Sequence, residues 1–162
     1  MDYERAIKPK KFSRQQAKLK AESYCAYQDR SQQEVRDKLY SWGLHQTDVE
    51  ELIADLITEN FLNEERFAFA YVSGKFKIKG WGKIKIKQGL KLHQIPQRLI
   101  QDALNHLEQD EYYYKLKGLL EKKAALLKES DPYKRKNKLV QYALSKGYEN
   151  ELIFDILTNN NL

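Results

Sequence analysis

The chain has 162 residues, of which 41% are hydrophobic and 32% are charged, and its formal net charge is +6. No apolar run approaches the ~20 residues that a membrane-spanning helix needs, and residues 1–12 lack the apolar segment of a secretory signal. The single cysteine, Cys25, excludes an intrachain disulfide and a cysteine metal cluster. We therefore expect a cytoplasmic protein without a cofactor, built as one domain or as a few small repeats.

Nearly every residue pattern is helical, and nine helices are predicted in chain order. Their expected ranges are 13–28, 31–42, 47–60, 63–78, 82–92, 96–108, 110–128, 132–146 and 149–159. Three starts fit the capping box, in which two side chains three residues apart bond each other's backbone amides: Ser13 with Gln16, Ser31 with Glu34, and Thr47 with Glu50. Asp131 followed by Pro132 predicts a further start, and Pro96 fits the first turn of another helix.

The stretch over residues 75–88 also fits a second structure. Four apolar residues alternate there with lysines, a period of two that is typical of a strand hairpin around Gly80-Trp81-Gly82. We favour helices, because Ile86 and Leu90 fall on a helical pattern and no other strand is predicted as a partner. The glycines then form a flexible elbow, which lacks the preceding strand and the spacing of a nucleotide-binding phosphate loop.

One apolar pattern recurs three times with its internal spacing intact. The second set follows the first after 51 residues, and the third follows after 53: Val35, Leu39, Val49, Leu52 and Ile53; Ile86, Leu90, Ile100, Ala103 and Leu104; Leu139, Ala143, Ile153, Ile156 and Leu157. Gly43 and Gly147 share one place in the turn of their sets, where a left-handed glycine ends a helix. Gln94 stands there in the middle set, which predicts a strained or altered turn.

The pattern predicts an all-α fold of three tandem three-helix repeats stacked into an elongated, curved rod. A non-repetitive helical bundle is the alternative, and we favour repeats because the spacing is held across a turn as well as within helices. The predicted parts are a flexible basic tail over residues 1–12 and repeats over residues 13–62, 63–108 and 109–162. The charge and the lack of a heptad seam favour a monomer.

Charge is distributed unevenly over these parts. Residues 31–65 carry a net charge of −7 and residues 66–108 carry +7, whereas residues 1–30 carry +4 and residues 109–162 carry +2. A basic segment of this density is typical of a surface that binds phosphate or another acidic surface, although most charged runs are only solvated. The sharp change of sign favours specific electrostatic recognition.

The basic middle repeat holds the candidate binding residues. Lys83, Lys87 and Lys91 are four apart and share one helix face, and Lys75 and Lys79 form a similar stripe before Gly80. Such a ridge tracks a phosphate backbone without reading base sequence. Trp81 and Tyr71 are candidates for stacking on a base, although a packing role for Trp81 is the preferred interpretation.

Other classes of protein are less well supported. The third helix of the first repeat begins with Asp48, Glu50 and Glu51, which phosphate would repel, so sequence-specific DNA reading by that repeat is not expected. The three histidines lack zinc-site spacing, and Cys25 stands in an apolar-aromatic stretch that favours a buried, inert thiol. We therefore expect no catalytic residue, no metal site and no enzymatic activity.

Three stretches resemble the RecX family, whose members regulate the bacterial recombinase RecA. The first contains Ser31, Glu34, Lys38 and Leu39; the second is Phe61-Leu62-Asn63-Glu64-Glu65-Arg66-Phe67-Ala68; the third is Lys79-Gly80-Trp81-Gly82 followed by Ile86, Leu90 and Ile95. The chain departs from the family pattern at four positions. Asn63 and Glu64 stand where the family usually has two aspartates, Gln94 stands where it usually has a glycine, and Gln28 stands where it often has an arginine. These departures put the geometry of the turns in question more than the fold.

The resemblance implies three tandem three-helix units, in agreement with the repeat. It also implies binding in the helical groove of a RecA–DNA filament and inhibition of filament growth, ATP hydrolysis and strand exchange. The expected partners are the RecA filament and, weakly and without sequence preference, single- and double-stranded DNA; no membrane is expected. The candidate contact residues are Lys75, Lys79, Lys83, Lys87, Lys91 and Arg66. A nucleic-acid-binding protein that acts without RecA, or a protein–protein adaptor with complementary acidic and basic repeats, remains open.

Overall fold

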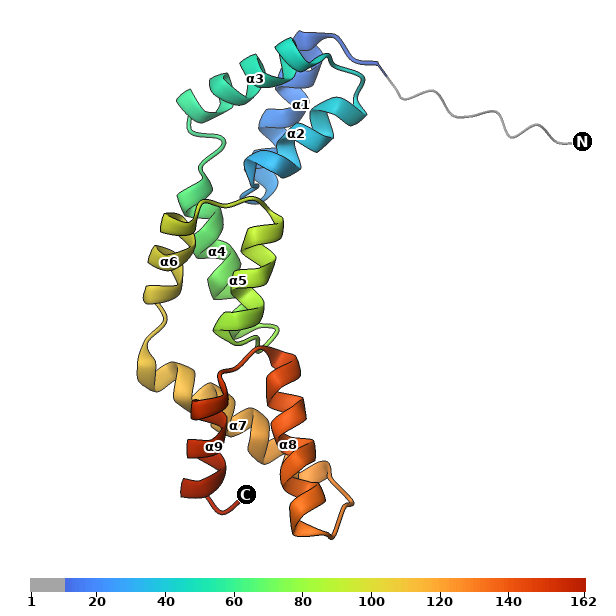
Figure 1. The fold of residues 1–162 in the computed structure, drawn as a ribbon. Coiled ribbons are helices and arrows are strands. Elements are labelled where there is room, and N and C mark those ends of the chain that lie inside the picture. The colour runs from blue at the N-terminus through green and yellow to red at the C-terminus, as the bar shows by residue number, and fades with distance from the viewer. Residues whose placement is uncertain (1–10) are drawn as a thin grey trace, which may run out of the picture. The chain divides into compact units, whose positions relative to one another are not determined.

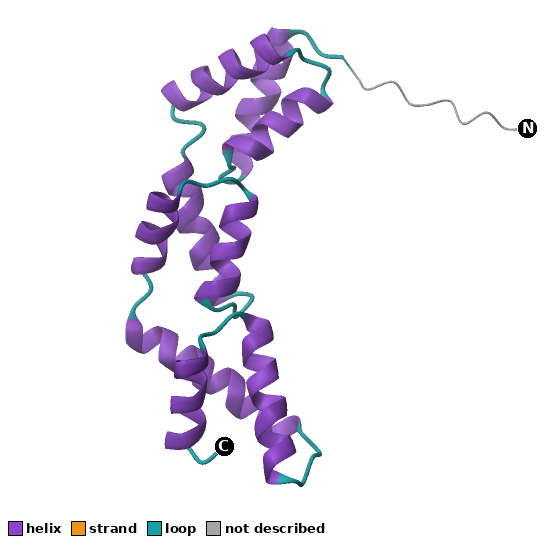
Figure 2. Cartoon of the chain, viewed as in Figure 1, coloured by secondary structure: helices purple, strands orange, loops and turns teal. Residues whose placement is uncertain are grey.

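The computed structural model describes residues 11–162, and over these residues the chain forms nine helices and no strand (Figures 1 and 2). The helices are α1 (Arg14–Tyr27), α2 (Gln32–Ser41), α3 (Gln46–Thr58), α4 (Glu64–Lys77), α5 (Lys83–Leu92), α6 (Gln97–Asn105), α7 (Gln109–Leu126), α8 (Pro132–Lys146) and α9 (Asn150–Asn159). The all-α prediction is confirmed. The predicted basic tail lies outside the described residues, except for Lys11 and Phe12.

The chain divides into two compact units, the first ending at Phe67 and the second beginning at Ala68. The first unit contains α1, α2, α3 and the start of α4, and the second contains the rest of α4 and the five helices that follow. The second and third sets of the apolar pattern therefore share one unit.

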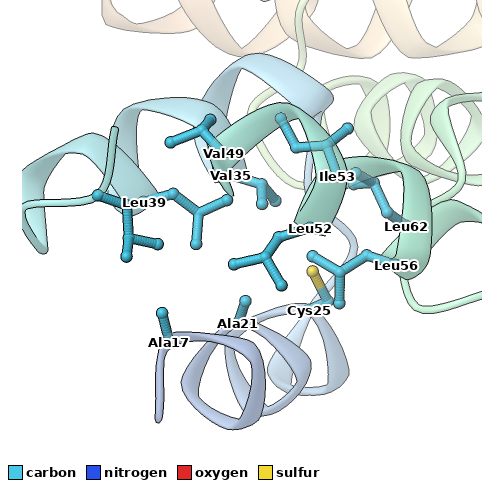
Figure 3. Close-up of a cluster of buried hydrophobic side chains, with 11 residues drawn as sticks. Ala17, Ala21, Cys25, Val35, Leu39, Val49, Leu52, Ile53, Leu56 and Leu62 are labelled. Carbon is cyan, nitrogen blue, oxygen red and sulfur yellow. The ribbon is translucent and has the colours of Figure 1, made fainter. Parts of the chain in front are cut away.

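The recurring apolar pattern forms the core. All fifteen of its positions are buried, and the most accessible, Leu104, exposes only 6% of its surface. In the first unit, Ala17, Ala21 and Cys25 of α1 face the pattern residues of α2 and α3 across this core (Figure 3). Small residues on α1 let the larger side chains of α2 and α3 approach its backbone closely, which agrees with the close packing of protein interiors.

The three turns predicted to be equivalent have the same backbone structure. Gly43, Gln94 and Gly147 all have a positive φ, of 86°, 57° and 94°. Each turn also has the same pair of hydrogen bonds, as in Leu44 N–H to Leu39 O at 3.3 Å and Gly43 N–H to Tyr40 O at 2.9 Å. Gln94 therefore keeps the left-handed turn without glycine, a backbone conformation that is less favourable for a residue with a Cβ atom, in agreement with the strained turn that the sequence predicted.

Most predicted helix starts are confirmed. Ser13 and Ser31 both form full capping boxes, and Asp131 accepts a hydrogen bond from the Tyr133 amide at 2.9 Å, with Pro132 in the first turn. The Thr47 capping box is wrong, because α3 begins one residue earlier, after His45, which makes no side-chain cap bond. Pro96 precedes α6 as its cap residue rather than entering its first turn.

Candidate nucleic-acid interface

The basic segment of the middle repeat folds as two helices joined by a short turn. α4 ends at Lys77 and α5 begins at Lys83, so the helical alternative is confirmed over residues 75–88 and the hairpin is not formed. Phe76 and Ile86, two of the alternating apolar residues, are buried, whereas Ile78 and Ile84 are exposed. The alternation therefore reflects two helices that each contribute part of their surface to the core.

The Gly80-Trp81-Gly82 turn is a packed junction and not a flexible elbow. Gly82 N–H donates to Lys146 O at 2.8 Å, and the hydroxyl of fully buried Tyr148 donates to Gly80 O at 3.0 Å. A Cβ atom on Gly82 would lie 2.4 Å from the carbonyl oxygen of Gly147, closer than nonbonded atoms approach. The expectation of flexibility is corrected, because the missing side chain serves close backbone contact between this turn and the end of α8.

The lysines of α5 point to two sides of the helix. Lys83 and Lys85 are two residues apart, which places them about 200° apart around the helix axis. The Lys83 ammonium lies 4.8 Å from the centre of the Tyr112 ring, and the Lys85 ammonium lies 4.7 Å from the centre of the Trp81 ring. By helical spacing, Lys87 and Lys91 follow the Lys83 side.

Lys75, the first lysine of the predicted stripe before Gly80, lies on the Trp81 side. The Lys75 ammonium is 4.8 Å from the centre of the Trp81 ring and 5.3 Å from that of Tyr71. The backbone carbonyl of Lys79 accepts a hydrogen bond from the Lys146 ammonium at 3.2 Å. Sequence reasoning missed Lys85 and Lys146, which reach this part of the surface through contacts with Trp81 and with the backbone of Lys79.

A pocket of about 430 Å³ lies on the Lys83 side. Four carboxylates line it, Asp110, Glu149, Glu151 and Asp155, together with Tyr112 and Tyr113. The buried Tyr112 hydroxyl donates to the Glu149 carboxylate at 2.9 Å and accepts the Lys83 N–H at 2.9 Å. Burial raises the pKa of Tyr112 well above its usual range, so the hydroxyl keeps its proton and caps the first turn of α5.

Arg66 has an internal role. Its Nε donates to the Asp29 carboxylate at 2.5 Å, and one terminal nitrogen donates to the carbonyls of Asn60 and Phe61 at 3.2 and 3.3 Å. These bonds tie the start of α4 to the turn before α2 and to the turn after α3. Its guanidinium is therefore bound within the chain, and a contact of Arg66 with an external partner stays a prediction.

The other residues of the family resemblance also serve the fold. Ser31 is buried and caps α2, while Glu34 completes its capping box. Leu39, Leu62, Phe67 and Ala68 are buried in the core. Lys38 accepts the Trp42 N–H at its backbone oxygen, and Gly80 and Gly82 form the packed junction.

The acidic segment of the first repeat is largely neutralised within the first unit. Arg14 lies beside Asp48, Glu51 and Asp55, three carboxylates on one side of α3. The Lys18 ammonium lies 2.8 Å from the Glu59 carboxylate. The Arg36 guanidinium donates to both carboxylate oxygens of Glu50, at 2.7 and 3.2 Å. By contrast, within residues 11–162 no lysine of α4 or α5 forms a salt bridge with a carboxylate.

The residues considered for chemistry do not assemble. Cys25 is buried, and burial raises the pKa of its thiol to about 11, which makes it a poor nucleophile at neutral pH. His93 and His106 pack against the Tyr71 and Phe69 rings, and His45 is exposed before α3. Among the described residues, no three side chains of metal-binding type come together.

The fold and this surface define a protein of three-helix repeats with unpaired cations on its middle repeat. Models of the first, second and third three-helix domains of RecX match residues 17–56, 63–104 and 110–157. The chain belongs to the RecX family. No helix in the described part of the chain is both long and apolar enough to cross a membrane.

Individual relatives agree with this assignment. The chain is 34% identical to the regulatory protein RecX of Clostridium perfringens strain SM101 over 136 residues, or 81% of this chain and 63% of the relative. It is 27% identical to that of Bacillus mycoides strain KBAB4 over 139 residues, or 86% of this chain and 52% of the relative. The chain therefore spans less than two thirds of the length of these relatives.

Solved structures give the same result. The crystal structure of RecX from Lactobacillus salivarius has a TM-score of 0.82 and 28% sequence identity, with 91% of this chain and 96% of that chain covered. Another crystal structure of a regulatory protein RecX has a TM-score of 0.79 at 21% identity, with 91% and 74% covered, and shows the shared fold. The predicted three tandem three-helix repeats are confirmed.

Proposed function

We propose that this chain regulates a RecA-type recombinase by binding RecA–DNA filaments in their helical groove. It mainly inhibits filament growth, ATP hydrolysis and strand exchange. Membership of a family of regulatory proteins supports this function, and the observation that carries it is the unpaired charge of the lysines on α4 and α5. In the first unit cations are matched by carboxylates, so the middle repeat is where an external polyanion gains most by binding.

Regulation of this kind requires no chemistry by the chain. A protein that binds one state of a filament more tightly than another shifts the balance between them by its difference in affinity alone. Lysines that contact phosphates would supply affinity without base specificity, which suits a regulator that must act wherever a filament forms. The chain itself acts as a non-enzymatic regulator in this proposal.

The test reverses charge on the side of α5 that Lys87 and Lys91 share. Lys87→Glu with Lys91→Glu is preferred to a triple variant with Lys83, because a carboxylate at Lys83 would enter the acidic pocket beside Glu149. Lys122→Glu with Lys128→Glu is the matched control, since both lysines are exposed and the change in net charge is the same. Inhibition of ATP hydrolysis and of strand exchange is titrated for each variant.

The α5 variant should need at least about tenfold more protein for half inhibition at low salt, and its binding should depend less steeply on salt. The control variant should behave as the parent does. Equal inhibition by the parent and the α5 variant would contradict the proposed contact surface. Binding to bare DNA that gains nothing when recombinase is added would instead favour a nucleic-acid-binding protein that acts without RecA.

A further inference from the structure

Two lysine ammonium groups lie close to the Trp81 ring on the surface of the second unit. The ammonium groups of Lys75 and Lys85 are 4.8 and 4.7 Å from the centre of its ring. Lys75 also lies 5.3 Å from the centre of the Tyr71 ring, which meets the His93 ring edge to face at 5.5 Å. Aromatic rings and cations therefore alternate along a strip formed by α4, the turn and α5.

The backbone of Trp81 is held firmly while its side chain stays accessible. Its N–H donates to Lys75 O at 3.0 Å, and the glycines on either side are buried in the junction with α8. The indole itself is half-buried, whereas the aromatic rings that form the core nearby, Phe76 and Tyr148, expose 1% and 0% of their surface. Part of the indole surface is therefore accessible to a ligand, beside the packing role preferred from sequence.

Within residues 11–162, the hydrogen-bond partners of the lysines along this strip are neutral. The Lys85 ammonium donates to the backbone oxygen of Ser145 at 3.4 Å, and the Lys146 ammonium donates to that of Lys79 at 3.2 Å. Ammonium groups held against a ring by the cation–π attraction are positioned but not neutralised, so they retain their affinity for phosphate. The strip offers both parts of a single-strand site, a stacking ring and flanking positive charge.

We propose that Trp81 stacks on an unpaired base of single-stranded DNA while Lys75 and Lys85 contact the phosphates beside that base. The inference rests on the proposed function and deepens it, because it assigns single-stranded DNA as the ligand of this site. Duplex DNA fits less well because its bases are already stacked on one another. The carboxylates of an acidic peptide would pair with the lysines, but they would not stack on the indole.

The two tryptophans of the chain make the stacking directly measurable. Trp42→Phe leaves Trp81 as the only indole, and its fluorescence is followed as DNA is added without recombinase. The probes are oligo(dT) of about fifteen nucleotides, within the range that single-strand sites occupy, an abasic strand of the same length, and a duplex. Oligo(dT) should quench the indole strongly, while the abasic strand, which carries the same phosphates, and the duplex should not.

Affinity is then measured by the anisotropy of labelled oligo(dT) in the parent background. Trp81→Leu should weaken binding about 5- to 150-fold, the range measured for loss of one stacked base, and Trp81→Phe should recover part of it. Trp42→Leu is the matched control and should bind as the parent does. Lys75→Gln with Lys85→Gln should lower the slope of log affinity against log salt by about 1.4, the value for two single-strand phosphate contacts.

Three results would overturn the proposal: no binding of oligo(dT), equal quenching by oligo(dT) and the abasic strand, or unchanged affinity in the folded Trp81→Leu protein. Because recombinase is absent from this titration, failure of the stacking site leaves the result with the Lys87 and Lys91 variant standing. If the Lys87 and Lys91 variant inhibits as well as the parent does, the fluorescence titration with DNA can still be interpreted. The two proposals are therefore tested separately.

Discussion

Charged side chains hold helices together in the first unit, whereas backbone groups do so around the α4–α5 turn of the second. In the first unit, Arg14 and Arg36 pair with carboxylates of α3, and Lys18 pairs with Glu59 just after it. In the second, Gly82 N–H bonds directly to Lys146 O, and the lysines beside it stay unpaired. The comparison teaches that charge counted along a sequence does not identify a binding surface, because charges that stabilise the fold are no longer available to a partner.

The largest effect should come from filling the glycine junction. Gly82→Ala places a methyl group 2.4 Å from the Gly147 oxygen and 2.5 Å from the Gly147 carbonyl carbon, and both of these are backbone atoms that cannot easily move. We expect the second unit to lose about 2–3 kcal/mol of stability, as in overpacked cores. Urea unfolding followed by Trp81 fluorescence in the Trp42→Phe background measures this loss.

Gly118→Ala is the matched control for that substitution. Gly118 lies within α7, and a Cβ atom there would meet nothing within 4 Å. The control should therefore gain about 0.5–1 kcal/mol, because alanine favours a helix interior over glycine. If Gly82→Ala were as stable as the parent, the description of the turn as a packed junction would be wrong.

Alkali should destabilise the second unit through two tyrosines of the same junction. Burial raises the pKa of Tyr112 and of Tyr148, so both keep their protons in the folded chain at pH values where the unfolded chain loses them. Their stabilising effect is complete below the ordinary tyrosine pKa of ~10 and is lost as the pH rises above it. Each should remove about 1.4 kcal/mol of stability between neutral pH and pH 11.

Replacing one tyrosine separates this effect from general alkaline damage. Tyr112→Phe should roughly halve the loss of stability between pH 9 and pH 11, measured by urea unfolding with Trp81 as the reporter. Tyr114→Phe, at a side chain that is 64% exposed, should leave the pH dependence unchanged. The same slope in all three proteins would show that these buried hydroxyls do not control it.

The sequence predicts the core better than the surface, for a physical reason. Burial repeats with the period of the helix, and this period can be recognised within a short stretch of sequence. The sequence pattern could therefore assign Leu39, Leu90 and Ala143 to the core. Gln94 could be placed in a left-handed turn by its register with Gly43 and Gly147. These predictions depend on spacing within a repeat and need no knowledge of distant contacts.

The surface depends on contacts between distant residues. Arg66 is bound within the chain by Asp29, 37 residues earlier, a contact that the residues around Arg66 do not indicate. Lys85 was missed because either side of α5 could face the Trp81 strip until the position of α8 is known. The pairing of the acidic segment was equally hidden, since Lys18 reaches Glu59 across 41 residues.

The smallest predicted effect tests the first half of the comparison. Arg36 holds Glu50 through two hydrogen bonds, which lower the pKa of the Glu50 carboxyl and raise that of the guanidinium. A double-mutant cycle with Arg36→Gln and Glu50→Gln should give a coupling of only about 0.3–1 kcal/mol, because both side chains are partly exposed to water. Urea unfolding of the four proteins measures it.

The coupling should respond to salt and pH in defined directions. It should shrink in about 1 M salt, where the Debye length falls to ~3 Å. Because the pKa of Glu50 is lowered in the folded chain, the contribution of this ion pair to stability is present above the ordinary glutamate pKa and is lost as the pH falls through the folded value.

Lys87→Gln with Lys91→Gln should by contrast cause no loss of stability at low salt, since removing unpaired like charges relieves repulsion. A loss there equal to the Arg36–Glu50 coupling would mean that these lysines also hold the fold, and the distinction between the two regions would fail.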